Sequence, residues 1–378
     1  MLDKDVTVRA ITVKIEGSCK SIVNTRMLTD FAPELRDTRG DHKETHEVLY
    51  QTQKVFPPRN IEQSSQSKVF TLPAGEHNYE FSFVIPLYSE CASRGSGGWG
   101  PLAVTHKQTK LPPSFQAVDD MACVEYFLKV TVDRASSFRI NQRAWKPVFF
   151  RPIDDTPTNP RPGLVNKGYY SRIPIALEPE NDKEKKKGFR SILPRSVKTG
   201  EPSRAYLECR TPAGAILVPS ERLPFQIFLH FTTPSRFNQL TVEEFTVSLF
   251  ELTQLRADHK TQNFSFETKL TNSKKLNTPL TITMASASPS GSEDMLQFEV
   301  GNELLKFIRI PGHIPPTFDS CNIKRSYAIK ISLGVRSSDL FSLTNVSVRF
   351  DITINSGFTL PSFEPPPPFE EELPAYEK

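Results

Sequence analysis

Residues 70–86, FTLPAGEHNYEFSFVIP, constrain the fold more than any other stretch of the chain. Four large apolar side chains fall on every second position, at Tyr79, Phe81, Phe83 and Ile85. Side chains two residues apart share one face of a β-strand, whereas on a helix they point to different sides. The preceding Pro-Ala-Gly favours a turn, and the strand ends at the following proline, which donates no ladder hydrogen bond. The stretch therefore predicts a turn and a half-buried antiparallel strand, with these four side chains facing a core.

The same alternation recurs through the rest of the sequence. It is present in residues 123–134, 225–231, 245–249, 327–335 and 346–354. Residues 240–256 would also fit a helix, but their β-branched content favours a strand. Together with 32 prolines, these runs predict an all-β fold of short strands joined by turns. We expect Tyr327, Ile329 and Ile331 to lie in a second core.

A change in composition divides the chain. At 378 residues it has room for roughly two domains. Prolines become frequent after residue 154, and residues 178–187 form a charged run, as expected of a linker. We therefore expect a first β domain over residues 1–178, with the linker starting at about 154, and a second over residues 188–356. Residues 357–378 have no periodicity and contain four consecutive prolines, which predicts a disordered tail.

The overall charge and the cysteines exclude several classes of protein. The 47 Lys and Arg residues against 43 Asp and Glu leave a net charge of +4, which is too even to predict a nucleic acid partner. The five cysteines are far apart and include no Cys-x-x-Cys pair, which is typical of reduced thiols in a cytosolic protein. No apolar run approaches the length of a membrane-spanning helix, and the first residues do not resemble a signal peptide.

Motifs that would indicate catalysis fail on their context. His42, Glu44 and His46 do not form a His-Glu-x-x-His metal motif, and their segment is expected to be a loop. Residues 95–100 match Gly-x-Gly-x-x-Gly, but Pro101 follows where a dinucleotide fingerprint would open a helix. We therefore expect no enzyme activity, no cofactor and no metal site.

Several of these strings together resemble one family. The signature Leu-Pro-x-Gly followed by alternating aromatic residues in 72–86 resembles that of the arrestin amino-terminal domain. Residues 126–134, YFLKVTVDR, resemble the strand that follows it, and residues 314–335 resemble a turn and strand of the arrestin carboxy-terminal domain. The order and spacing are most similar to the fungal α-arrestins, the arrestin-related trafficking adaptors. The resemblance implies two tandem immunoglobulin-like antiparallel β-sandwiches.

The beginning of the chain departs from this family. Residues 11–23, ITVKIEGSCKSIV, resemble a strand pair that family members place after some earlier strands. We therefore expect the first domain to lack its first strands, to expose an apolar edge or face, and to be less stable than the second. Within the first strand the apolar positions change parity after Val8, which predicts a bulge near Ala10 or a strand covered on both faces.

The tail carries a motif for partner binding. Leu373-Pro374-Ala375-Tyr376 resembles the Leu-Pro-x-Tyr variant by which fungal α-arrestins recruit HECT-class ubiquitin ligases that carry WW domains. WW domains grip extended proline-rich peptides in an aromatic groove. The polyproline run that includes Pro366 and Pro367 adds to such a ligand.

A basic cluster lies in the expected linker, at Lys183, Lys185, Lys186 and Lys187. It fits a solvated linker, a contact with anionic lipid headgroups or acidic receptor tails, or a set of ubiquitin acceptors, and the sequence does not separate these.

The family resemblance implies a non-catalytic adaptor. It would link membrane transporters or receptors, through their cytosolic tails, to a WW-domain HECT ubiquitin ligase for ubiquitin-dependent endocytosis and sorting. Such a protein would be cytoplasmic and recruited to the plasma membrane or endosomes. The alternative is an arrestin-fold structural or sorting-coat subunit that recruits no ubiquitin ligase.

Overall fold

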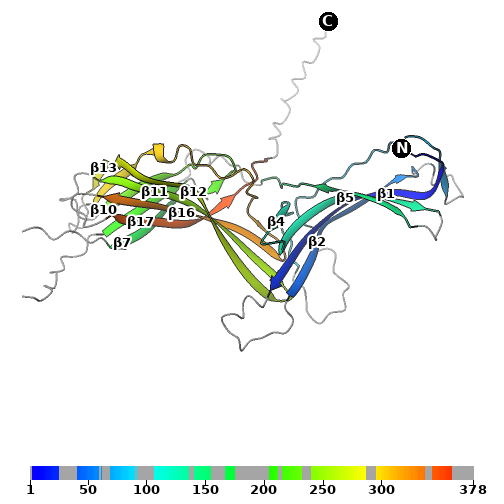
Figure 1. The fold of residues 1–378 in the computed structure, drawn as a ribbon, viewed down its shortest axis with the longest axis horizontal. Coiled ribbons are helices and arrows are strands. Elements are labelled where there is room, and N and C mark those ends of the chain that lie inside the picture. Colours follow the sequence, from blue (N-terminus) through cyan, green and yellow to red (C-terminus); the bar gives the residue numbers. More distant parts are fainter. Residues whose placement is uncertain are drawn as a thin grey trace, which may run out of the picture.

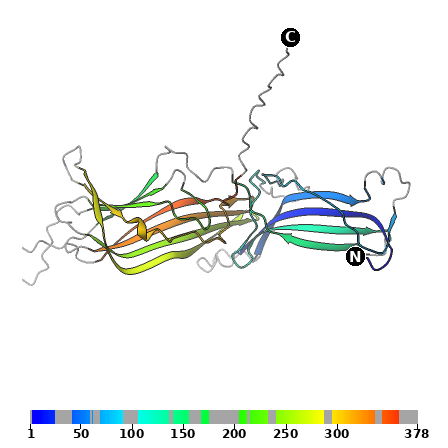
Figure 2. The same ribbon diagram turned by 90° about the horizontal axis from the view of Figure 1, so that it is seen from above.

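The computed structural model describes residues 2–24, 41–58, 61, 69–89, 91, 106–135, 140–154, 167–174, 204–211, 215–231, 240–286, 295–336 and 343–359. These residues form an elongated, two-lobed molecule in which the two halves lie end to end (Figures 1 and 2). Apart from single helical turns, the regular elements in the described part of the chain are strands, and nearly all of their pairings are antiparallel. The all-β arrestin fold predicted from the sequence is confirmed.

The described residues of the first half form one six-stranded sheet. Its main path runs β2 (Asp41–Phe56), β1 (Val6–Asn24), β5 (Ala122–Arg134) and β4 (Phe115–Ala117). The short β3 (Phe70–Leu72) also pairs with β1, and β6 (Gln142–Val148) pairs with β5. The register between β1 and β5 shifts between Val8 and Ala10, so the bulge predicted there is confirmed.

The second half contains two sheets that enclose one core. The first sheet has the order β13 (Thr281–Ser286), β14 (Met295–Val300), β10 (Gln226–Phe231), β8 (Arg204–Thr211) and β7 (Lys167–Pro174). The second has the order β12 (Lys260–Pro279), β11 (Thr241–Ala257), β16 (Ile323–Arg336), β17 (Thr344–Ile354) and β9 (Ile216–Leu217), with β15 (Phe318–Asp319) paired to β16. The 3-10 turn Asn302–Leu304 follows β14.

The core of the second half matches the alternation of its sequence. Tyr327, Ile329 and Ile331 are fully buried, as predicted, and they pack with apolar residues of the opposite sheet such as Leu229 and Phe298. The segment that would also have fitted a helix is the strand β11. Burying alternate side chains of both sheets against each other is the standard way in which a β-sandwich gains hydrophobic stabilisation.

Residues 78–86 differ from the prediction because they do not form a paired strand. The segment is extended, and side chains rather than a strand ladder hold it: the Gln51 amide nitrogen donates to Val84 O at 2.8 Å, and Ser82 N donates to the Gln53 side-chain oxygen at 3.2 Å. Both glutamines belong to β2. Among the described residues no strand pairs with the segment, so its backbone has no ladder partner.

The four aromatic and aliphatic side chains of this segment are accordingly only partly covered. Tyr79 and Phe83 are half-buried and pack against the core of the first half, but Phe81 is 43% and Ile85 38% exposed. The prediction that all four are buried was therefore wrong. The first half does expose apolar surface, as expected, and its lower stability remains a prediction.

The expected linker contains a strand. β7 lies between residues 154 and 178 and pairs along its length with β8 of the second half. This part of the chain was assigned to the first domain and its linker, whereas its hydrogen bonds connect it to the second half. The backbone before it is anchored as well: Asp154 N donates to Phe358 O at 2.7 Å, and the Asp154 carboxylate accepts hydrogen bonds from Ser356 N and Gly357 N.

The two halves share a hydrophobic cluster at their junction. The β11–β12 hairpin and the start of β16 reach from the second half to the ends of β1 and β2 (Figure 1). Leu255, Ala257, Phe318 and Ile323 of the second half pack into one buried cluster with residues of the first. This cluster includes Ile15, Cys19, Val48, Leu49, Leu111, Phe115 and Val124. The halves therefore meet through a packed interface rather than through a linker alone.

Candidate functional site between the two halves

The site residues predicted from the sequence lie outside the described residues. These are Pro366, Pro367, Leu373, Pro374 and Tyr376 of the tail and Lys183, Lys185, Lys186 and Lys187 of the basic cluster. Their roles remain predictions. The described residues contain a different constellation of chemically active side chains, at the junction of the two halves.

Asn322 connects the halves through its side-chain amide. The residue precedes β16 and is 2% exposed. Its Nδ2 donates to Ser21 Oγ at 2.9 Å and lies 3.3 Å from both Cys19 O and Glu44 O, which belong to β1 and β2. The Ser21 hydroxyl in turn donates to Arg256 O at 2.6 Å. A polar network from both halves is thus buried next to the shared hydrophobic cluster.

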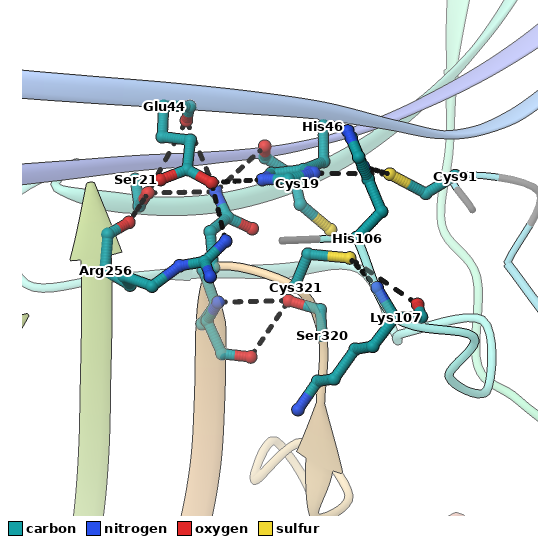
Figure 3. Close-up of polar contacts among 12 residues, drawn as sticks. Cys19, Ser21, Glu44, His46, Cys91, His106, Lys107, Arg256, Ser320 and Cys321 are labelled. Carbon is teal, nitrogen blue, oxygen red and sulfur yellow. Dashed lines mark hydrogen bonds and ion pairs between the residues drawn. The ribbon is translucent and has the colours of Figure 1, made fainter. Parts of the chain in front are cut away.

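Two histidines and two cysteines converge beside this network (Figure 3). His46 comes from β2, Cys91 and His106 from the chain between β3 and β4, and Cys321 from the turn between β15 and β16. One ligand atom from each residue lies within 4.8 Å of the ligand atoms of the other three. His46 Nδ1 is 3.2 Å from Cys91 Sγ, and that sulfur is 2.9 Å from His106 Nδ1. Three of the four residues are buried.

A carboxylate orients one of the histidines. His46 Nε2 lies 2.5 Å from Glu44 Oε1, and Arg256 of the second half donates to the same oxygen at 2.7 Å. The carboxylate fixes the orientation of the ring, so that its other nitrogen, Nδ1, faces Cys91. Burial acts against ionisation of Glu44, but its hydrogen bond with His46 and its contact with Arg256 outweigh burial and lower the pKa of this carboxyl.

The surroundings of Cys91 and Cys321 shift the pKa values of the two thiols in opposite directions. Burial raises the pKa of the Cys91 thiol to about 12. Burial also acts to raise the pKa of Cys321, but hydrogen bonds from His46 and from the backbone N–H of Lys107 outweigh it, so this pKa is lowered. Burial would lower the pKa of His46, yet its hydrogen bonds with Cys321 and Glu44 raise that pKa to about 9. The Cys321 thiolate is thus the anion that the cluster favours.

His106, the fourth residue of the group, has one ring nitrogen that is buried without a hydrogen-bond partner among the described residues. Its ring meets that of His46 edge-on, with 5.0 Å between the ring centroids. The buried nitrogen without a partner is Nε2. Burial lowers the pKa of this imidazole, so the neutral form is favoured.

Sequence reasoning did not find this constellation. His46 was considered together with His42, but the His42 ring instead faces Asp258, with its Nδ1 3.3 Å from a carboxylate oxygen. His46 and Cys91 are 45 residues apart, Cys91 and His106 are 15 apart, and Cys321 lies far beyond them. No short-range spacing therefore marks the group, and only the fold brings the four side chains together.

Comparisons with known proteins bear on the whole chain. The family model described as Arrestin (or S-antigen), N-terminal domain, matches residues 1–102. A protein of Lachancea thermotolerans named Arrestin-related trafficking adapter 10 is 24% identical across 100% of this chain and 93% of its own length. A protein of the same name from Saccharomyces cerevisiae strain S288c is 28% identical over 120 residues, which is 31% of this chain and 23% of that protein. In the part of the chain that the structure describes, no helix has the length and apolar character needed to cross a bilayer.

Proposed function

Because this chain belongs to the fungal α-arrestins, the arrestin-related trafficking adaptors, we propose that it links membrane transporters or receptors to a WW-domain HECT ubiquitin ligase. The observation that carries the proposal is similarity over the full length of the chain to a trafficking adapter. The chain is not an enzyme, since the family acts by joining other proteins. The ligase would ubiquitylate the cargo, which would then be directed into endocytosis and sorting.

The tail would supply the contact with the ligase. Leu373, Pro374 and Tyr376 give the Leu-Pro-x-Tyr pattern, with Pro366 and Pro367 nearby in an extended proline run. Pro374 restricts the backbone to an extended conformation, and Tyr376 offers a ring and a hydroxyl to the WW domain. The last described residues, 355–359, are anchored beside Asp154 at the junction, so the tail starts from the middle of the molecule.

Cargo would bind to the two lobes, and the chain would act at the plasma membrane or endosomes after recruitment from the cytoplasm. Sheet surfaces with exposed apolar and aromatic side chains, such as Trp145 and Phe149 in the first half, suit contact with cytosolic tails of membrane proteins.

Binding of the tail to WW domains tests the proposal. A labelled peptide of residues 357–378 is titrated with the WW domains of a HECT ligase, and fluorescence anisotropy gives the dissociation constant. We expect micromolar affinity, about −8 kcal/mol, because a short peptide buries little area and is ordered on binding. Tyr376→Ala should weaken binding by about 2 kcal/mol, or about thirtyfold, if the ring is the main anchor. Equal affinity of the two peptides would remove the support for ligase recruitment.

The basic cluster needs a separate test because the sequence leaves several roles open to it. We propose that Lys183, Lys185, Lys186 and Lys187 serve as ubiquitin acceptors or as a contact for anionic lipids. Replacing all four by arginine keeps the positive charge but removes the amines that accept ubiquitin. Loss of ubiquitylation with unchanged binding to anionic vesicles would assign the acceptor role, and replacement by glutamine would weaken vesicle binding if the lipid role is correct.

A further inference from the structure

We propose that His46, Cys91, His106 and Cys321 form a structural zinc site that fastens the two halves of the molecule together. Nothing in the adaptor role requires a metal, and the inference rests on the described geometry of the junction alone. Two thiolates and two imidazoles are a standard ligand set for structural zinc.

The distances suit a tetrahedral ion. With zinc–sulfur bonds of about 2.3 Å and zinc–nitrogen bonds of about 2.0–2.1 Å, neighbouring ligand atoms are roughly 3.4–3.8 Å apart. The four ligand atoms lie within 4.8 Å of one another, and the contacts of Cys91 Sγ with His46 Nδ1 and His106 Nδ1 are 3.2 and 2.9 Å. Shifts of less than about 1 Å, within the reach of side-chain rotations, would bring the atoms onto a tetrahedron around one ion.

The surrounding groups match those that support zinc ligands in proteins. Zinc-bound histidines usually donate their second ring nitrogen to a carboxylate, which fixes the tautomer and ring orientation. Glu44 stands in this position relative to His46 and is itself held by Arg256. Lys107 N donates to Cys321 Sγ at 3.4 Å, as expected for a bond that stabilises a thiolate.

The closure of the site points to a structural rather than a catalytic ion. Four protein ligands complete a tetrahedron and leave no position for water or substrate. His46, Cys91 and Cys321 are 1%, 3% and 8% exposed, so the ion would be shielded from solvent. Three ligands come from the first half and Cys321 from the second, so the ion would cross-link the halves. It would add to the hydrophobic cluster and the Asn322 network that already join them.

Metal binding by the purified full-length chain tests the proposal. The chain is expressed with zinc in the medium, and elemental analysis is combined with measurement of protein concentration. We expect one zinc per chain. After chelation, cobalt(II) should restore occupancy and give the visible absorption of tetrahedral cobalt together with thiolate-to-cobalt charge transfer.

Matched variants assign the ligands. Cys91→Ser and Cys321→Ser should abolish the charge-transfer band and lower zinc content to background, whereas Cys123→Ser, a cysteine of β5 outside the group, should leave both unchanged. Glu44→Gln should retain zinc but bind it about 10–100-fold more weakly, because the carboxylate that orients His46 is lost.

A measurement on the unaltered chain guards against variants that fail to fold. Zinc should protect Cys91 and Cys321 from alkylation, and chelation should expose these two cysteines while the reactivity of Cys123 stays the same. The proposal is overturned if the folded chain binds neither zinc nor cobalt above background. It is also overturned if peptide mapping finds Cys91 and Cys321 joined as a disulfide in the chain as purified, because the pair would then be a redox link. None of these outcomes depends on the tail, so the metal-binding experiments and the WW-domain experiment test their two proposals independently.

Discussion

Asn322 allows the strength of the junction to be tested by an isosteric change. In Asn322→Asp, an oxygen replaces the amide nitrogen that lies 2.9–3.3 Å from Ser21 Oγ, Cys19 O and Glu44 O. The variant keeps the volume and loses the donors. It also places a carboxylate against two carbonyl oxygens at a buried position.

The expected cost follows from those contacts. The amide has two N–H groups, and each hydrogen bond contributes about 0.5–1.5 kcal/mol, so Asn322→Ala should destabilise the junction by about 2–3 kcal/mol including the unpaired acceptors. Asn322→Asp should cost about 3–5 kcal/mol, because it leaves a buried charge without a partner. The order Asp worse than Ala is the sharper expectation, since a pure loss of packing would reverse it.

Urea-induced unfolding and hydrogen exchange measure the effect. Unfolding is followed by circular dichroism, and exchange is followed at the ends of β1 and β11, which meet at the junction. Asn272→Ala is the matched control, because Asn272 is exposed and accepts one side-chain hydrogen bond from Thr246. Its effect should stay within about 0.5 kcal/mol. If Asn322→Asp unfolds and exchanges like the parent chain, the amide does not hold the halves together and the reasoning is wrong.

Two further predictions concern the cores and the anchor of the tail. Phe298→Ala, in the fully buried core of the second half, should lower the free energy of unfolding by about 3–5 kcal/mol. Phe83→Ala should lower it by only about 1–2 kcal/mol, because that ring is half-buried. Calorimetry of both variants measures the two losses, and equal losses would contradict the difference in burial. Asp154→Ala removes the acceptor of Ser356 N and Gly357 N. The amide hydrogens of residues 356–358 should therefore exchange faster, and a protease should cleave there sooner. Asp351→Ala, which removes an exposed carboxyl of β17, is the control and should change neither rate.

The sequence predicted those elements whose signal is local. In β16, a period of two places Tyr327, Ile329 and Ile331 on one face, and each is fully buried. The bulge near Ala10 could likewise be predicted, because the apolar positions change parity within a few neighbouring residues after Val8. Both inferences need only the geometry of one strand.

The pairing of strands and the convergence of the site side chains were harder to predict, because both depend on residues that are far apart in the sequence. The alternation in residues 78–86 indicates which side chains share a face, but it does not supply a neighbouring strand, and the segment lies unpaired against β2. β7 was missed because prolines on both sides dominate the local composition, while its partner β8 begins 30 residues later. The histidine and cysteine group is drawn from β2, the connection between β3 and β4, and the turn before β16, so no window of the sequence contains it.

The anchoring of residues 356–358 by Asp154 limits how far Tyr376 can lie from the junction of the two halves. Tyr376 follows Thr359 by 17 residues, and a chain spans at most about 3.3–3.6 Å per residue, so the tyrosine lies no farther than about 60 Å from the junction in any conformation. If the tyrosine holds a ligase, the bound WW domain stays inside a sphere centred where the lobes meet. The reach of the ligase beyond that sphere is then set by its own dimensions, so lysines of a cargo beyond the combined reach would not be modified, however tightly the cargo is bound. Inserting residues after Thr359 would enlarge the sphere and change which lysines are modified, without altering any contact with cargo or ligase.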